Sequence, residues 1–135
     1  MKVLVCGGRD YVDRESLFGT PTAMHATTPF TLVIHGAAKG TDRLAGEWAE
    51  SVGIPVAAYP ADWKRYRGSA GPRRNAQMLA EGKPDLVVAF PGGTGTANMI
   101  GQATAASVQV HQVAGDDRER GAPETVPQSA SGGTP

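Results

Sequence analysis

Five short apolar segments, separated by stretches with helical periodicity, constrain the fold of this chain more than any other feature. The segments are Lys2–Cys6, Thr31–Ile34, Pro55–Tyr59, Asp85–Phe90 and Val108–Val113. Strands that alternate with helices pair in parallel through right-handed crossovers. We therefore expect a single doubly wound α/β domain, built on a parallel sheet of about five strands in the order 3-2-1-4-5.

The composition of the segments indicates their places in the sheet. The fourth, Asp85–Phe90, is almost entirely apolar, as expected of a central strand that is buried on both faces. The fifth, Val108–Val113, alternates between apolar and polar residues, which favours a place nearer the edge.

Helical periodicity is clearest in Thr41–Val52, where one apolar stripe would pack on the sheet. Two further helices are expected at Pro72–Glu81 and Thr96–Ala106. The stretch Asp13–His25 is expected to form only a short or broken helix, because a glycine and a proline interrupt it. The residues that support these expectations are Leu44, Ala45, Trp48, Ala49 and Val52 in the stripe, and Gly19 and Pro21 as the interruptions.

With 135 residues, 40% of them hydrophobic, the chain has the size of one globular domain, which we expect to span residues 1–114. From Gly115 the composition changes to Gly, Pro, Ser, Thr and charged residues, so residues 115–135 are expected to form a flexible tail. Apolar segments are too short for a signal peptide or a membrane span, and the single Cys6 is expected in the core. These features favour a cytoplasmic protein that does not contact a membrane.

Two glycine-rich loops follow the strands that are neighbours where the expected strand order reverses. Gly7–Asp10 follows the first strand, and Pro91–Thr96 follows the fourth. Ligands of open α/β sheets bind beyond the carboxyl ends of the strands at this reversal. Glycine lets backbone N–H groups approach a phosphate, and a helix that starts at such a loop favours an anion at its first turn. The predicted ligand-binding residues in the two loops are Gly7, Gly8, Arg9, Asp10, Gly92, Gly93, Thr94, Gly95 and Thr96.

The loop after the second segment, His35–Asp42, adds Gly36, Lys39 and Asp42 to the predicted site. For Asp42, capping of the following helix is an equally good interpretation. The loop is not a P-loop, because it lacks the order Gly-Lys-Ser/Thr.

Neither a metal ion nor a redox cofactor is expected. A second His or Cys at metal-ligand spacing from His35 is missing from the sequence. The first loop lacks the full G-x-G-x-x-G pattern, and the second strand ends in His35 where a dinucleotide-binding fold has an acid.

The chain has no formal net charge, but its basic residues gather between Ala61 and Asn75. In the expected helix Pro72–Glu81, two arginines would lie in the first turn, where cations oppose the helix dipole and an anion would relieve the repulsion. Two aromatic residues of the same region either stack on a base or cover the edge of the core. The basic residues are Lys64, Arg65, Arg67, Arg73 and Arg74; the predicted binding residues are Arg73, Arg74 and Asn75, with Trp63 and Tyr66 for base stacking.

Five segments of the chain resemble the YspA-like branch of the SLOG superfamily, whose members are widespread in bacteria and their phages. The similarity runs in order from residue 1 to about residue 113. The superfamily includes the LOG phosphoribohydrolases and the DNA-processing protein DprA. The resemblance implies a Rossmann-like fold and a nucleotide or nucleotide-derived ligand. The segments are Val5–Tyr11, His35–Asp42, Pro60–Trp63, Ala70–Asn75 and Phe90–Thr96.

One departure from the LOG pattern bears on catalysis. LOG enzymes carry a catalytic glutamate three residues after the glycine-rich motif, and Met99 stands at that position here. A thioether cannot act as an acid or a base. Arg74 corresponds to an arginine that LOG enzymes use, and Asp10, Asp42 or Asp62 would have to supply the missing carboxylate.

We therefore expect a module that binds a nucleotide or a nucleotide-derived anion as a sensor, carrier or sponge. One alternative is a LOG-like hydrolase that cleaves the N-glycosidic bond of a nucleotide, with Asp10, Asp42 and Arg74 as the candidate catalytic residues. The second alternative is binding of single-stranded nucleic acid, as in DprA. A homodimer or higher homo-oligomer is expected in each case.

Overall fold

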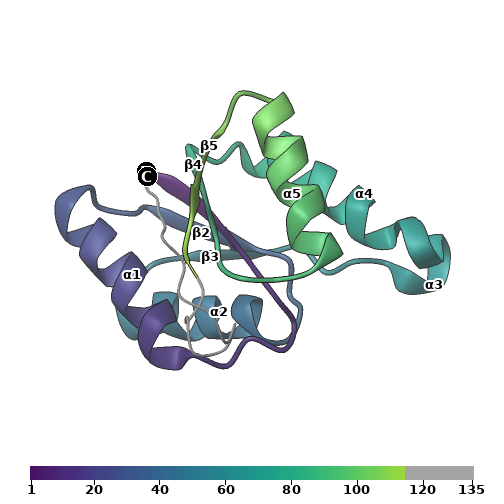
Figure 1. Ribbon diagram of the computed structural model, residues 1–135. Coiled ribbons are helices and arrows are strands. Elements are labelled where there is room, and N and C mark those ends of the chain that lie inside the picture. Colours follow the sequence, from purple (N-terminus) through teal and green to yellow (C-terminus); the bar gives the residue numbers. More distant parts are fainter. Residues whose placement is uncertain (115–135) are drawn as a thin grey trace.

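The computed structural model describes residues 1–114, and the tail predicted at residues 115–135 lies outside the described part of the chain. Five strands form one parallel sheet in the order β3-β2-β1-β4-β5, with helices on both faces (Figure 1). The predicted doubly wound α/β fold and its strand order are confirmed, and the topology is Rossmann-like. The strands are β1 (Lys2–Cys6), β2 (Leu32–His35), β3 (Val56–Ala58), β4 (Leu86–Ala89) and β5 (Gln109–Gln112).

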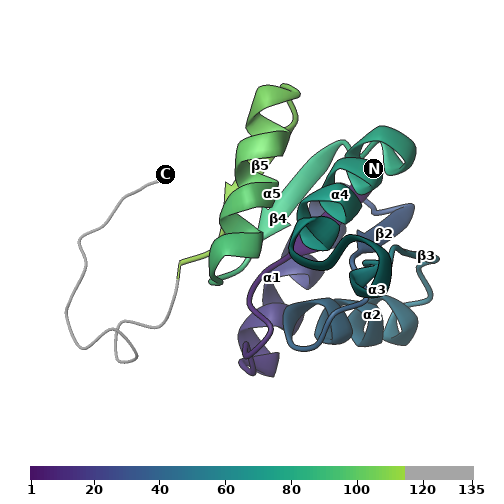
Figure 2. The same ribbon diagram turned by 90° about the vertical axis from the view of Figure 1, so that its right-hand side faces the viewer.

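Two layers of helices enclose the sheet. Helices α1 and α2 cover one face, and α4 and α5 lie side by side on the other (Figures 1 and 2). None of the helices in residues 1–114 has the length and apolar character that crossing a membrane requires. The helices are α1 (Arg14–Thr27), α2 (Thr41–Ser51), α3 (Trp63–Tyr66), α4 (Ala70–Gln77) and α5 (Thr94–Ala105), with a 3-10 turn η1 (Arg67–Ser69) before α4 and a π-helical turn η2 (Met78–Gly82) after it.

The alternation of side chains along β1 divides the core into two clusters. Val3 and Val5 pack with α1 and α2, whereas Leu4 and Cys6 pack with η2 and α5. Every residue of β4 is buried, while the edge strand β5 is largely exposed. The places predicted for these two strands are therefore confirmed.

The prediction of a short or broken first helix is wrong, because α1 runs without interruption for 14 residues and contains Pro21. Asp13 caps the helix by accepting a hydrogen bond from the backbone N–H of Ser16 at 3.0 Å. Leu17 and Pro21 are buried, and the indole N–H of Trp48 donates to the Thr22 hydroxyl at 2.9 Å. Tertiary packing thus outweighs the roughly 3 kcal/mol by which proline disfavours a helix interior.

The apolar stripe predicted for α2 is correct except at its end. Ala45, Trp48 and Ala49 are buried, but Val52 is 43% exposed and follows the last residue of the helix. Gly53 then adopts a φ of 77°, the left-handed conformation in which glycine commonly ends a helix.

Two helices begin earlier than predicted. Helix α5 begins at Thr94 instead of Thr96, and α4 begins at Ala70 instead of Pro72. Arg74 consequently lies in the last turn of α4, so the predicted repulsion between this arginine and the helix dipole is wrong.

Candidate functional site

A cavity of about 790 Å³ opens at the carboxyl ends of the central strands, between the loops after β1, β2 and β4 and the helices α3, α4 and α5. Three predicted site residues, Gly92, Arg73 and Tyr66, do not line it. The predicted residues that do are Gly7, Gly8, Arg9, Asp10, Gly36, Lys39, Asp42, Trp63, Arg74, Asn75, Gly93, Thr94, Gly95 and Thr96.

The two glycine-rich loops pack directly against each other. The backbone N–H of Gly8 donates to the carbonyl oxygen of Pro91 at 2.9 Å. A Cβ on Gly92 would lie 2.6 Å from the backbone nitrogen of Gly8. A Cβ on Gly7 would lie 2.9 Å from the Cβ of Phe90. These two glycines are therefore required for close packing of the loops, whatever else binds there.

Gly93 and Gly95 differ from these packing glycines. Apart from the adjoining residues and the backbone of α5 itself, a Cβ on either residue would meet no protein atom within 4 Å. Both glycines line the cavity, so the space above their backbone is open to a ligand.

Helix α5 begins at this open space with no side-chain cap, after Gly93 as the N-cap residue. The first helical hydrogen bond runs from the N–H of Ala97 to the carbonyl oxygen of Gly93 at 3.0 Å. The N–H groups of Thr94, Gly95 and Thr96 precede this ladder and carry the positive end of the helix dipole. This arrangement suits an anion.

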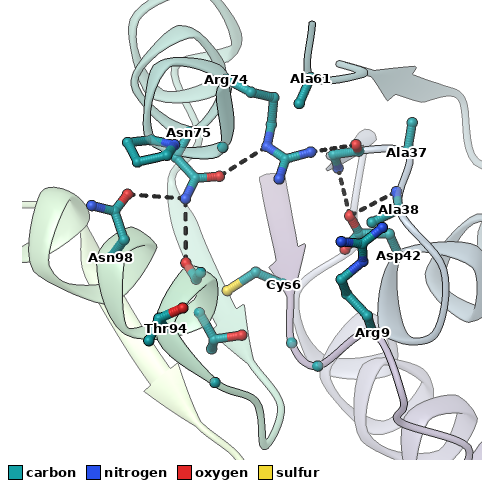
Figure 3. Close-up of a pocket in the computed structure, with 18 of the residues that line it drawn as sticks. Cys6, Arg9, Ala37, Ala38, Asp42, Ala61, Arg74, Asn75, Thr94 and Asn98 are labelled. Atoms are coloured by element: carbon teal, nitrogen blue, oxygen red, sulfur yellow. Dashed lines mark hydrogen bonds between the residues drawn. The ribbon is translucent and has the colours of Figure 1, made fainter. Parts of the chain in front are cut away.

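On the opposite side of the cavity, Arg74 is held at two of its three nitrogens. Its Nη1 donates to the carbonyl oxygen of Gly36 at 2.5 Å, and its Nε donates to Oδ1 of Asn75 at 3.0 Å. Figure 3 shows the remaining nitrogen pointing between Asn75 and Asp42, toward Cys6. Burial lowers the pKa of the guanidinium, while the charge of Asp42 raises it.

Asp42 closes the loop between β2 and α2. Its Oδ2 accepts hydrogen bonds from the N–H groups of Gly36 at 3.1 Å and Ala38 at 3.2 Å (Figure 3). The N-cap of α2 is Gly40, so the alternative in which Asp42 caps this helix is wrong. Burial raises the pKa of the carboxyl group to about 6, opposed by the two N–H donors and by Arg74.

His35 belongs to the same loop but serves its structure. Its Nδ1 accepts a hydrogen bond from the N–H of Ala37 at 2.9 Å. Burial and the charge of Arg74 lower the pKa of the imidazole, so it is neutral at physiological pH.

The residues that line the cavity but were not predicted include Cys6, Asn98 and Met78. Burial raises the pKa of the Cys6 thiol to about 12, so the thiol is protonated and unreactive as a nucleophile. Asn98 lies four residues after Thr94, and this helical spacing would have placed both on one face of α5.

Met99, which the resemblance places at the position of the LOG glutamate, lies on the core side of α5 and is fully buried. Its neighbour Asn98 lines the cavity instead. An amide cannot replace a carboxylate as an acid or a base. Helix α5 thus presents no titratable side chain to the cavity.

The two predicted aromatic residues occupy different places. Trp63 lines the cavity and is 49% exposed. Tyr66 lies with Arg73 in a second hollow of about 320 Å³ on the other side of Arg74. The Arg73 guanidinium carbon is 4.3 Å from the centroid of the Tyr66 ring, and that of Arg65 is 5.0 Å away. Tyr66 therefore pairs with arginines outside the main cavity.

Comparisons with known proteins identify relatives of this chain. The family model described as YspA, cpYpsA-related SLOG family matches residues 1–66. The Gene 61 protein of Mycobacterium phage D29 is 32% identical over 117 residues, which cover 81% of this chain and 93% of that protein. A solved structure, phosphoribosylglycinamide formyltransferase from Bacillus halodurans, is 20% identical with a TM-score of 0.46; the match covers 83% of this chain but 55% of the formyltransferase, about half its length. The chain belongs to the YspA, cpYpsA-related SLOG family.

Proposed function

We propose that this protein binds a nucleotide or a nucleotide-derived anion in the cavity, with a phosphate between the first turn of α5 and the Arg74 guanidinium. The observation that carries the proposal is the convergence of these two groups on one cavity, where Gly93 and Gly95 leave the backbone of α5 open. Backbone N–H groups and an arginine are the donors that phosphates prefer in proteins.

The charges that line the cavity favour an anion. Three cations, Arg9, Lys39 and Arg74, face two carboxyl groups, Asp10 and Asp42. The pKa of Asp42 is raised to about 6, so part of its negative charge is removed at mildly acidic pH. A phosphate adds negative charge to a site with a surplus of positive charge.

The part of the cavity formed by α3 and the start of α4 suits a base. Apolar residues and the planar indole of Trp63 line this part of the cavity. The residues are Pro60, Ala61, Trp63, Gly71 and Pro72. An exposed indole offers a face on which a purine or pyrimidine stacks, at a typical gain of about 1–3 kcal/mol.

Binding has more support than cleavage. A LOG-like mechanism needs a carboxylate at the glycosidic carbon, and α5 offers Asn98 and the buried Met99 instead. Asp10 remains a candidate on the first loop because it lines the cavity. Single-stranded nucleic acid has less support, because Tyr66 pairs with Arg73 outside this cavity.

One observation favours the hydrolase as the second candidate function. Asp42 lines the cavity, and its pKa of about 6 lets it exchange a proton near neutral pH. The Asp42 carboxylate is, however, already the acceptor for two backbone N–H groups.

Calorimetric titration with AMP, GMP, CMP and UMP, each followed by chromatography for free base, tests both functions. Saturable binding with intact nucleotide supports the binding module. Release of base that is lost in Asp42→Asn or Asp10→Asn supports the hydrolase instead. Absence of both binding and base release contradicts the proposal. Light scattering of the same samples tests the proposed homo-oligomer, which a monomer mass at micromolar concentration would contradict.

A further inference from the structure

Asn75 is a buried polar residue whose side-chain amide makes three hydrogen bonds to protein partners. Its exposed fraction is 5%, and it lies on α4 directly after Arg74. Its Oδ1 accepts from Nε of Arg74 at 3.0 Å. Its Nδ2 donates to the carbonyl oxygen of Gly95 at 3.3 Å and to Oδ1 of Asn98 at 3.1 Å (Figure 3). Although we predicted Asn75 as a ligand contact, these bonds leave its amide little capacity for a ligand.

One end of this network fixes the direction of Arg74. A guanidinium is planar, so hydrogen bonds at two of its nitrogens determine where the third one points. Asn75 holds Nε, and the carbonyl oxygen of Gly36 holds Nη1. Without the bond to Asn75, the guanidinium would be free to turn about its bond to Gly36.

The other end of the network holds the first turn of α5. Gly95 lies in that turn, and Asn98 follows one turn later. Oδ1 of Asn98 also accepts from Nε2 of Gln102 at 2.7 Å, and the same nitrogen donates to the carbonyl oxygen of Pro72 at 3.1 Å. The side-chain amides of Asn75, Asn98 and Gln102 therefore link α4 and α5 beside the cavity by hydrogen bonds.

We infer that Asn75 is a positioning residue that sets the Arg74 guanidinium against the first turn of α5, so that both address one anion. The inference rests on the proposed function for the identity of that anion. It assigns Asn75 an indirect role, because the residue acts through Arg74 and Gly95 and does not touch the ligand.

The chemistry at position 75 requires an amide. The side chain must offer one acceptor to Arg74 and two donors to the oxygens of Gly95 and Asn98. Aspartate would keep the acceptor but present an oxygen to two other oxygens. Alanine would remove all three bonds.

The first measurement needs no ligand. In a nuclear magnetic resonance spectrum of the ¹⁵N-labelled full chain, the Nε–H signal of Arg74 should be protected from exchange with water. Asn75→Ala should lose this protection, whereas Asn75→Asp should keep it because a carboxylate also accepts the bond. The matched control is Gln77→Ala on the same helix, whose side chain bonds to Glu81 at 3.4 Å. If the Arg74 Nε–H stays protected in Asn75→Ala, the inference is overturned. If Asn75→Ala does not fold, the folded Asn75→Asp variant decides, and loss of protection there overturns the inference.

The second measurement is a double-mutant cycle for AMP affinity. Asn75→Ala should weaken binding about tenfold when Arg74 is present, because the guanidinium is no longer anchored and has to be ordered on binding. In an Arg74→Ala background the same substitution should have a clearly smaller effect, because only the bonds to Gly95 and Asn98 remain to be lost. Equal weakening in both backgrounds would overturn the inference. Absence of AMP binding in the wild type would instead count against the proposed function, and the Arg74 signal would still decide the role of Asn75.

Discussion

The Arg74 guanidinium donates a hydrogen bond to the carbonyl oxygen of Gly36 at 2.5 Å, and this bond joins α4 to the loop after β2. The contact is possible because Gly36 has no side chain: a Cβ there would lie 2.7 Å from the guanidinium carbon. A cation on one helix is thereby aimed at the start of another helix across the cavity.

Gly36→Ala should displace Arg74 and weaken AMP binding by about tenfold, because the guanidinium loses its fixed direction. The control is Gly101→Ala on α5, where a Cβ would meet no atom within 4 Å. Alanine at this exposed helix position should leave AMP affinity unchanged and raise the free energy of unfolding by about 0.5–1 kcal/mol. Calorimetric titration and urea unfolding measure the two effects; unchanged AMP affinity in Gly36→Ala would contradict the role given to Arg74.

Two glycines of the same loop should respond differently to alanine. Gly92→Ala should destabilise the fold, because its Cβ would lie 2.6 Å from the Gly8 nitrogen. Gly95→Ala should leave the melting temperature nearly unchanged, because its Cβ meets no protein atom within 4 Å. The same Cβ should weaken AMP binding by about tenfold or more, since it occupies the space through which a phosphate reaches the backbone. If Gly95→Ala binds AMP as tightly as the wild type, the phosphate lies elsewhere.

The stability of the protein should depend on the protonation of Asp42. Burial raises the pKa of this carboxyl group from 3.8 to about 6, so the folded state binds the proton more tightly than the unfolded state. The stability contributed by the protonated group is present below pH 4 and is lost as the pH rises through about 6. The full difference is up to about 3 kcal/mol.

Asp42→Asn should remove this dependence, because an amide oxygen can still accept from the loop without carrying charge. Urea unfolding should therefore find the variant more stable than the wild type at pH 8, with a smaller difference at pH 4.5. Parallel stability profiles for the two proteins between these pH values would show that Asp42 does not titrate in this range.

The two tryptophans offer a test of base stacking. Trp63 is 49% exposed at the cavity, whereas Trp48 is 2% exposed in the core. AMP should protect the fluorescence of Trp63 from quenching by iodide, and this change should vanish in Trp63→Phe, which retains Trp48. A ligand-dependent change that persists in Trp63→Phe would assign it to another part of the molecule.

Much of the fold follows from local sequence patterns. The buried strand β4 and the exposed edge strand β5 were both predicted, because runs of apolar residues and their alternation report burial directly. The continuity of α1 was not predictable in this way. It depends on Trp48, which is 26 residues from Thr22 in sequence and stabilises the turn after Pro21 by a hydrogen bond.

For the candidate site, the sequence indicates which loops meet but not what each residue does there. Topology alone brings Gly7–Asp10 and the loop before α5 together. Gly92 packs against the first glycine-rich loop, whereas the backbone of Gly95 faces open space. This difference depends on distances across the site. The engagement of Asn75 by α5 likewise follows from tertiary contacts 20 and 23 residues apart.

The central claim is that a phosphate binds at the first turn of α5. Its most direct test is the change in backbone amide resonances on titration of the ¹⁵N-labelled protein with AMP, with adenosine as the ligand that lacks the phosphate. We predict that AMP causes its largest shifts at Thr94, Gly95 and Thr96 and that adenosine leaves these three signals in place. Absence of AMP-induced shifts, equal shifts with adenosine, or shifts confined to the hollow around Tyr66 and Arg73 would contradict the account.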